Sequence, residues 1–278
     1  MISIGKTARL QVIRQFDFGV FLHGGDYGDI LLPARYVPHG CRVDDWLDVF
    51  ICLDSEDTLI ATTQKPYVQV GEYAHLEVVD TNYNGAFLDW GLSKDLLVPF
   101  KEQRVPMKVG NFYTVYVFED KSGRICGSSK LDDFLKEESD GEFEENQAVQ
   151  LHIASQSPLG YKAIINGTHL GLIFNSDVLG PIRLGQKMQG YIKNIRPDGA
   201  IDLMLQPRGA GMRDDLSERI LADLKKEGGV LYLTDKSAPE DIFDRYQVSK
   251  SNYKKALGNL YKEKKIILGK DKITLPEK

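Results

Sequence analysis

The chain has 278 residues, of which 42% are apolar and 27% charged, and its formal net charge is −5. These values place it in the ordinary soluble globular class. No apolar run approaches the roughly 20 residues that a membrane-spanning helix needs, and the first ten residues lack the apolar core of a signal peptide. We therefore expect a protein of the cytoplasm that has no membrane partner.

The residues with reactive or metal-binding side chains form no recognisable site. Cys41, Cys52 and Cys126 include no CxxC pair, which predicts neither a disulfide framework nor a zinc cluster. The five histidines are scattered without the spacing of metal ligands. The chain has no Walker loop, no GxSxG motif and no catalytic Cys/His signature. We expect neither an enzyme nor a cofactor or metal.

The charge is distributed unevenly along the chain. Residues 1–67 and 68–135 each carry a net −3, residues 136–145 carry −5, residues 146–207 carry +2, and residues 208–278 carry +4. A basic carboxy-terminal part is compatible with a nucleic-acid partner, although +4 on a small domain is common.

Residues 1–66 alternate between apolar and polar side chains in five short runs separated by turn residues. Five short strands in fewer than 70 residues suit a small closed barrel, because an open sheet would leave its edges exposed. We expect these strands at residues 8–13, 19–22, 29–32, 46–53 and 58–62.

The same design recurs twice. The sequence DFGVFL at 17–22 has an echo, NGAFL at 84–88, which lies 66 residues later, and Gly160 follows Gly85 by 75 residues. The period is too long for a solenoid, so each copy should be a complete domain. We expect a second barrel over 67–135 and a third over 146–207, with the acidic run 136–145 as a solvated linker or exposed helical turn. The predicted strands are 74–79, 85–88, 96–98, 113–118 and 124–127 in the second copy, and 148–154, 161–165, 170–174, 187–195 and 200–205 in the third.

After the breaker-rich stretch 206–211 the apolar period changes from 2 to 3.6. Leu216, Ile220 and Leu224 share one face of a first predicted helix. Ser237 and Glu240 have capping-box spacing for a second helix, which buries Ile242, Phe243 and Tyr246. Ser249 caps a third helix, whose apolar face includes Tyr253, Ala256, Leu257, Leu260 and Tyr261. With a hairpin over 266–275, this makes a winged helix-turn-helix over 212–278.

The first two copies resemble S1 RNA-binding domains, which are five-stranded oligonucleotide-binding (OB-fold) barrels. Residues 17–21 match the family's DFGAF motif almost residue for residue, and Gly85, Ala86 and Phe87 match its GAF. Asp120 and Arg124 match the closing D-x-x-x-R, whereas Thr58 replaces that arginine in the first copy. The third copy is degenerate and keeps GLIFNS at 171–176, where the family has GLVHIS.

Three S1-like barrels followed by a winged helix resemble the conserved virulence factor B family of bacterial RNA-binding regulators. The expected fold is therefore mainly β with α, and the resemblance implies a non-enzymatic regulator. On S1 barrels, exposed aromatic rings stack on bases and basic side chains meet phosphates. The candidate RNA-binding residues are Phe18, Phe21, His23, Phe87, Arg124, Tyr161 and Phe174 on the barrels, and Lys250, Lys254, Lys255 and Lys270 on the winged helix. For each ring, a place in the barrel core is the competing interpretation.

Three functions stay open at this point. The first is a single-stranded RNA binder that acts in post-transcriptional regulation. The second is a transcription regulator that binds duplex DNA through the winged helix, whose third helix carries Asn252 as its one evident base reader. The third is a scaffold that docks on ribosome or nuclease machinery.

Overall fold

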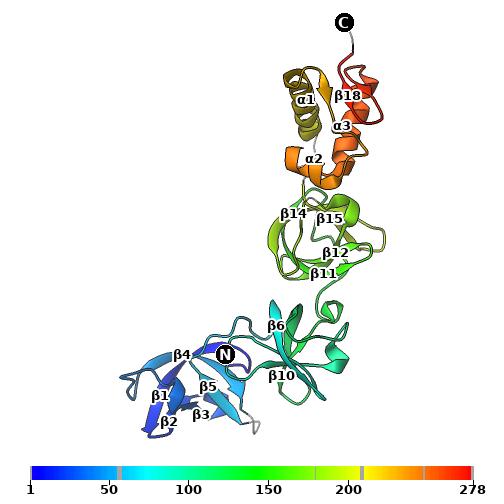
Figure 1. The fold of residues 1–278 in the computed structure, drawn as a ribbon. Coiled ribbons are helices and arrows are strands. Elements are labelled where there is room, and N and C mark those ends of the chain that lie inside the picture. Colours follow the sequence, from blue (N-terminus) through cyan, green and yellow to red (C-terminus); the bar gives the residue numbers. More distant parts are fainter. Residues whose placement is uncertain (1, 55–57, 179, 207–209, 247, 277–278) are drawn as a thin grey trace. The chain divides into compact units, whose positions relative to one another are not determined.

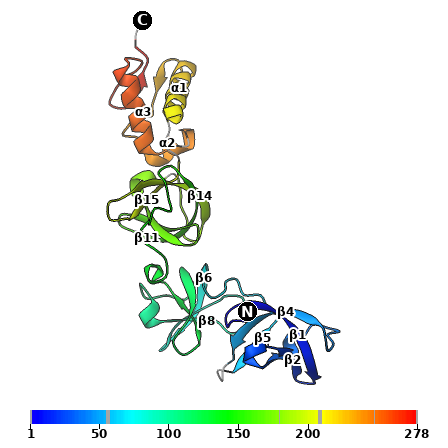
Figure 2. The same ribbon diagram turned by 180° about the vertical axis from the view of Figure 1, so that it is seen from behind.

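A computed structural model gives the fold, and it describes residues 2–54, 58–178, 180–206, 210–246 and 248–276. Figure 1 shows three small β-structures in chain order, followed by a helical domain, and Figure 2 shows the same elements from behind. The chain divides into two compact units, Met1–Leu135 and Lys136–Lys278. No helix of the described residues is long and apolar enough to cross a membrane.

Barrel 1, the first β-structure, is a closed five-stranded barrel in the order β1-β2-β3-β5-β4. The barrel closes where β3 and β5 run parallel and Leu31 pairs with Ile60. The alternate inward residues, such as Val12, Leu22 and Leu32, are fully buried in one core. Its strands are β1 (Thr7–Phe16), β2 (Gly19–His23), β3 (Asp29–Pro33), β4 (Trp46–Leu53) and β5 (Leu59–Thr62).

Barrel 2 repeats this design but is not closed. Its sheet runs β10-β9-β6-β7-β8, and no ladder among the described residues joins β8 to β10. Side chains still fill this open seam, because a Cβ at Gly127 on β10 would lie 2.9 Å from Val98 Cγ2 on β8. The strands are β6 (Tyr73–Asn82), β7 (Gly85–Leu88), β8 (Leu96–Pro99), β9 (Phe112–Glu119) and β10 (Ile125–Ser128).

Barrels 1 and 2 pack against each other within the first unit. Phe50 of β4 is 1% exposed and belongs to the apolar cluster of barrel 2, where its ring meets the Trp90 ring edge-on at 5.7 Å. The Gly5 carbonyl accepts a hydrogen bond from the Val70 amide at 3.0 Å. Apolar burial and backbone bonds together hold the two barrels as one body.

Barrel 3 is again closed, in the order β11-β12-β13-β15-β14. Its strands β13 and β15 run parallel and pair at three positions, which include Ile173 opposite Leu203. The strands are β11 (Ala148–Ser157), β12 (Gly160–Ile165), β13 (His169–Phe174), β14 (Lys187–Ile195) and β15 (Ile201–Met204).

The acidic run 136–145 is not a solvated linker, so that prediction is wrong. Its backbone bonds to barrel 3, since the Leu170 amide donates to the Lys136 carbonyl at 2.7 Å and the Ser139 amide to the Gly199 carbonyl at 2.9 Å. Phe143 is 8% exposed, belongs to the barrel 3 core, and meets the His169 ring edge-on. The burial of Phe143 and these backbone hydrogen bonds hold the run against barrel 3, while its charged side chains stay at the surface.

The carboxy-terminal domain is the predicted winged helix. Its helices α1 (Ala210–Lys226), α2 (Pro239–Tyr246) and α3 (Lys250–Lys262) share one apolar core. A small sheet covers them in the order β16 (Val230–Leu231), β18 (Ile273–Thr274), β17 (Ile267–Leu268). The helix α1 begins inside the stretch 206–211 that was predicted as a linker, of which residues 207–209 lie outside the described residues.

Local predictions in this domain have mixed outcomes. Ser249 caps α3 as expected, and its Oγ accepts from the Asn252 amide at 3.2 Å. Ser237 caps no helix, because α2 starts at Pro239 and the Ser237 Oγ accepts from the Thr234 amide instead. Tyr261, which was predicted to be on the apolar face of α3, is 55% exposed. The fold class itself, mainly β with a winged helix, is confirmed.

Candidate nucleic-acid interface

An equivalent glycine in each of the three barrels fixes the same backbone geometry at the start of the second strand. Gly19, Gly85 and Gly160 each open the second strand with a φ near +150°, a region that other residues rarely adopt. A Cβ there would lie 2.3, 2.2 and 2.0 Å from the carbonyl oxygen of Leu32, Val98 and Ile173, respectively. The first strand of each barrel also carries a bulge opposite this hairpin. These shared features allow outward positions to be compared among the barrels.

In barrel 1 the outward positions form an exposed aromatic cluster, which comprises Phe16, Phe18 and Phe21. The rings of Phe16 and Phe18 stack at 5.2 Å with an interplanar angle of 10°, and both meet the Phe21 ring edge-on, at 5.8 and 6.2 Å. Phe18 is 58% and Phe16 47% exposed, whereas Phe21 is half-buried. Neither predicted ring, Phe18 or Phe21, is part of the barrel core.

Arg14 completes the aromatic cluster. Its guanidinium carbon lies 5.0 Å from the centre of the Phe21 ring, and the same group forms an ion pair with Asp29. The cluster thus combines exposed ring faces with a cation, which are the two groups that single-stranded nucleic-acid sites use for bases and phosphates. Sequence reasoning missed both Arg14 and Phe16, although the two lie two residues apart on β1, directly before the turn that carries Phe18.

His23 lies at the end of β2 and is exposed. Its Nδ1 accepts a hydrogen bond from the Gly25 amide at 3.3 Å, which leaves Nε2 as the protonated nitrogen when the ring is neutral. The imidazole can therefore donate one hydrogen bond to an acceptor on a nucleotide.

In barrel 2 the position of Phe21 is occupied by Phe87, which is half-buried and paired with Leu97 of β8. The position of Arg14 is occupied by Asp80, which pairs with Phe87 across the strands. The pKa of Asp95 is raised, first by burial and then by the carboxylates of Asp89 and Asp80. This outer face is therefore acidic, and it repels phosphate more than the equivalent face of barrel 1 does.

Arg124 is exposed directly before β10, and its backbone amide donates a hydrogen bond to Asp120. The Asp120 Oδ1 accepts from the backbone amides of Ser122 and Arg124, at 2.8 and 3.1 Å. Burial alone would raise the Asp120 pKa, but the hydrogen bonds from Ser122 and Arg124 outweigh it and lower the pKa. Asp120 therefore organises the turn that precedes β10.

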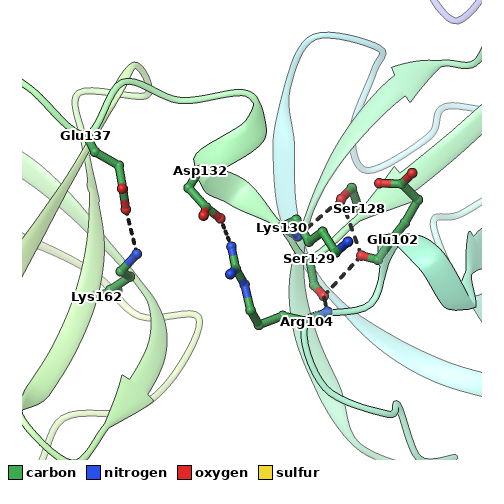
Figure 3. A network of polar contacts seen from close by, with 8 residues as sticks. All are labelled: Glu102, Arg104, Ser128, Ser129, Lys130, Asp132, Glu137 and Lys162. Carbon is green, nitrogen blue, oxygen red and sulfur yellow. Dashed lines mark hydrogen bonds and ion pairs between the residues drawn. The ribbon is translucent and has the colours of Figure 1, made fainter.

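In barrel 3 the two predicted rings have different environments. Tyr161 occupies the inward position of Val20 and Ala86 and packs partly against the barrel core, so its placement favours the core interpretation. The outward position is taken by Lys162, which pairs with Glu137 at 2.7 Å (Figure 3).

Phe174 lies close to two cations. Lys193 Nζ and the Arg196 guanidinium carbon are each 5.5 Å from its ring centre. Asp177 and Asp202 pair with these cations at 2.5 and 2.6 Å. Sequence reasoning missed Lys193 and Arg196 because β14 and the turn after it approach Phe174 only through the closure of the barrel.

The predicted lysines of the winged helix are not equivalent. Lys250 Nζ donates to the Ser237 carbonyl at 2.8 Å, and Lys254 lies 3.9 Å from the Asp235 carboxylate. Lys255 and Lys270 are exposed. Lys255 shares an exposed face of α3 with three residues at helical spacing, which are Asn252, Asn259 and Lys262.

A separate polar network in barrel 2 fixes the loop that precedes β9 (Figure 3). The Ser129 Oγ accepts from the Arg104 amide at 2.8 Å, the Ser129 amide donates to the Glu102 carbonyl at 2.9 Å, and the Arg104 side chain pairs with Asp132. Among the described residues, no cluster of three or more histidine, cysteine or acidic side chains could hold a metal ion.

Comparison with known proteins gives the class of this chain. Residues 4–64 and 70–130 match a family model described as "S1 domain", and residues 218–275 match one described as "CvfB-like winged helix domain". S1 and winged-helix domains together define a nucleic-acid-binding protein. No enzyme family is indicated.

The relatives identify the family. The chain is 30% identical to the uncharacterized protein YitL of Bacillus subtilis, over 94% of this chain and 90% of that protein. It is 25% identical to conserved virulence factor B of Staphylococcus epidermidis, over 82% and 79% of the two chains. The chain belongs to the conserved virulence factor B family.

A solved structure from Streptococcus pneumoniae, described as a multidomain protein with nucleic acid binding domains, is 26% identical and covers 98% of each chain, with a TM-score of 0.42.

Proposed function

We propose that this chain is a non-enzymatic, single-stranded RNA-binding protein that acts in post-transcriptional regulation. The observation that carries the proposal is the aromatic cluster of barrel 1. Two stacked, half-exposed rings, Phe16 and Phe18, offer unpaired bases a flat surface, and Arg14 lies beside the third ring. Stacking of this kind contributes about 1–3 kcal/mol per base and requires an unpaired strand.

Barrel 3 supports the same proposal with a different arrangement. Phe174 with Lys193 and Arg196 combines a half-buried ring with two cations, so it can stack on a base while its neighbours meet phosphate. Sites of modest affinity on one chain gain avidity when a strand reaches more than one of them.

Duplex DNA is a second candidate partner, and it is favoured by α3. The exposed face formed by Asn252, Lys255, Asn259 and Lys262 has the residue types that contact bases and phosphates in a major groove.

Filter binding with a poly(U) strand, a poly(A) strand and a random DNA duplex separates the two candidates. We expect both RNA strands to bind more tightly than the duplex, with affinities that fall as salt rises. Tighter binding of the duplex would overturn the RNA proposal in favour of the α3 surface. Absence of binding to all three would favour a scaffold that docks through protein contacts.

A further inference from the structure

The acidic run contains a segment, residues 136–143, that adds a strand-like strap to barrel 3. Lys136 pairs in parallel with His169 at the start of β13, and Glu138 pairs in the antiparallel sense with Ala200, directly before β15. The ladder between β13 and β15 starts after these positions. The strap therefore fills the gap between the two strands at the end where they do not yet pair with each other.

The strap meets an apolar pair that barrel 1 lacks. Ile164 and Leu170 are cross-strand partners whose side chains point outward by alternation, yet they are 0% and 3% exposed and lie outside the core cluster of the barrel. The Leu170 amide donates to the Lys136 carbonyl of the strap. The same positions of barrel 1 hold His23 and Asp29, which are also cross-strand partners but are exposed. Barrel 3 thus carries apolar side chains where a covering segment stabilises it, and barrel 1 does not.

Glu137 of the strap contacts a cation on the outer face of β12. Its carboxylate lies 2.7 Å from Lys162 Nζ, and Figure 3 shows the two side chains directed at each other. Lys162 occupies the position that Phe21 has in barrel 1. It pairs with Leu172, which alternates with Phe174 along β13, so Lys162 and Phe174 belong to one outer surface. A carboxylate and a phosphate compete for such a lysine, because both accept hydrogen bonds from its ammonium group.

The strap is anchored by other contacts besides this one. Glu142 accepts a hydrogen bond from Lys136 Nζ at 2.9 Å, and its second carboxylate oxygen lies 2.6 Å from His169 Nε2. The hydrogen bond from Lys136 is the main cause that lowers the Glu142 pKa. Phe143 is buried and meets the His169 ring edge-on. Loss of the Glu137 contact alone should therefore leave the strap attached to barrel 3.

We propose that the strap is an autoinhibitory element of barrel 3, in which the Glu137 carboxylate takes the place of a phosphate on Lys162. The inference rests on the proposed function for the ligand, a single-stranded RNA, and adds a regulation of its binding. A strand that reaches Lys162 must first break this ion pair, so it binds more weakly than the bare face of the barrel would allow. The side chains of Lys162 and Glu137 are 44% and 51% exposed, and an ion pair of such exposed groups is weak enough for a strand to displace.

Filter binding of poly(U) by the full-length protein at several salt concentrations tests this inference. Glu137→Gln should tighten binding about two- to fivefold, the range that an exposed ion pair allows. It should also steepen the fall of log affinity with log salt by up to about one unit, because one more cation becomes available to phosphate. Glu145→Gln is the matched control, since Glu145 is an exposed carboxylate of the same acidic run that lies outside the strap. The control should change both quantities less than Glu137→Gln does.

A double-mutant cycle with Lys162→Gln assigns the gain to the ion pair. Lys162→Gln alone should change poly(U) affinity little, because Glu137 already occupies the lysine. In the Glu137→Gln background, the same change should remove the gain and return the affinity to nearly that of the unchanged protein. Thermal unfolding of each variant checks that the fold is kept.

Two results would overturn the inference and leave the proposed function standing. One is an equal effect of Glu137→Gln and Glu145→Gln on poly(U) binding, which would show that net charge alone is the cause. The other is a gain from Glu137→Gln that persists after Lys162→Gln, which would show that the ion pair does not restrain binding. Failure of the unchanged protein and of every variant to bind poly(U) would instead reject the proposed function, and the autoinhibitory role of the strap with it.

Discussion

The residue that precedes the fixed glycine differs in each barrel, and so does the surface that it creates. It is Phe18 in barrel 1, Asn84 in barrel 2 and Leu159 in barrel 3, and two of these are large exposed apolar side chains, at 58% for Phe18 and 65% for Leu159. Only Phe18 has a ring, and only there do neighbouring rings stack on it. The aromatic surface of barrel 1 thus depends on single side chains rather than on a different backbone.

Phe18→Ala should weaken binding of a single-stranded RNA hexamer by about five- to a hundredfold, the range expected for loss of one stacking partner. The thermal transition should not change, because the ring is outside the core. Leu159→Ala is the matched control, since it removes an exposed apolar side chain at the equivalent turn without removing a ring. Equal effects of the two changes on RNA binding would contradict a stacking role.

Asp95→Asn should stabilise the protein slightly at pH 7. The raised pKa of Asp95, caused first by burial and then by Asp89 and Asp80, means that its ionised form is less favourable in the folded than in the unfolded chain. The ionised Asp95 carboxylate therefore lowers the free energy of unfolding at any pH above its pKa in the folded protein. This destabilisation disappears as the pH falls below the usual aspartate pKa of 3.8.

We therefore expect a gain of up to about 0.5 kcal/mol in unfolding free energy, since solvent screens this exposed group. Urea unfolding of both proteins at pH 7 and pH 3 measures it. A gain that persists at pH 3 would show that charge is not its cause.

At the scale of elements, the hairpin between the first two strands sets the register of each barrel. Gly85 needs both its positive φ and the absence of a Cβ, because the Val98 carbonyl oxygen would lie 2.2 Å from that atom. Gly110 also has a positive φ, of 81°, but no heavy atom lies within 4 Å of its ideal Cβ. A substitution at Gly110 would therefore introduce backbone strain alone, whereas one at Gly85 would add a steric clash with the Val98 carbonyl.

Gly110→Ala should cost about 1 kcal/mol of stability from the left-handed backbone alone. Gly85→Ala should cost about 1–3 kcal/mol more, because the strands must also move apart. Chemical denaturation of the two variants compares them directly. Similar losses would mean that β7 and β8 adjust to the methyl group without strain.

Elements with local signals were predictable, and those that depend on long-range contacts were not. Alternation located every barrel strand within a few residues, and the Ser249 cap located the start of α3. The run 136–145 was misjudged because its composition is dominated by exposed carboxylates, whereas its position is decided by Phe143 and by backbone bonds to barrel 3. For Tyr161 the structure favours the competing core interpretation, which the sequence alone did not decide because a slip of one residue along a strand moves a side chain to the other face.

At the scale of the whole molecule, the charge imbalance of the sequence is distributed between two units. The residues of Met1–Leu135 carry a net −6 and those of Lys136–Lys278 a net +1. The aromatic cluster of barrel 1 belongs to the acidic unit, so the proposed function would rely there on a placed arginine, Arg14, to meet phosphate. The lysines of α3 belong to the other unit, where the proposed function would use them for general attraction to phosphate.

Lys254→Ala with Lys255→Ala should lower the slope of log affinity against log salt by up to about two units for a single-stranded RNA long enough to reach α3. Lys250 is left intact because its bond to Ser237 also supports the fold. Lys101→Ala with Lys108→Ala removes the same charge from exposed positions of the first unit and serves as the control. If both pairs changed the slope equally, net charge rather than the α3 surface would explain the effect.

The recurring glycine has a consequence for redesign. Because Gly19, Gly85 and Gly160 hold the same backbone geometry, the residue before each can be exchanged between barrels without altering the hairpin. Leu159→Phe with Ser157→Phe, the positions equivalent to Phe18 and Phe16, would place a pair of rings on barrel 3, which also carries the cations Lys193 and Arg196. Under the proposed function, we therefore expect that binding of a single strand can be moved from one barrel to another by changing one or two side chains.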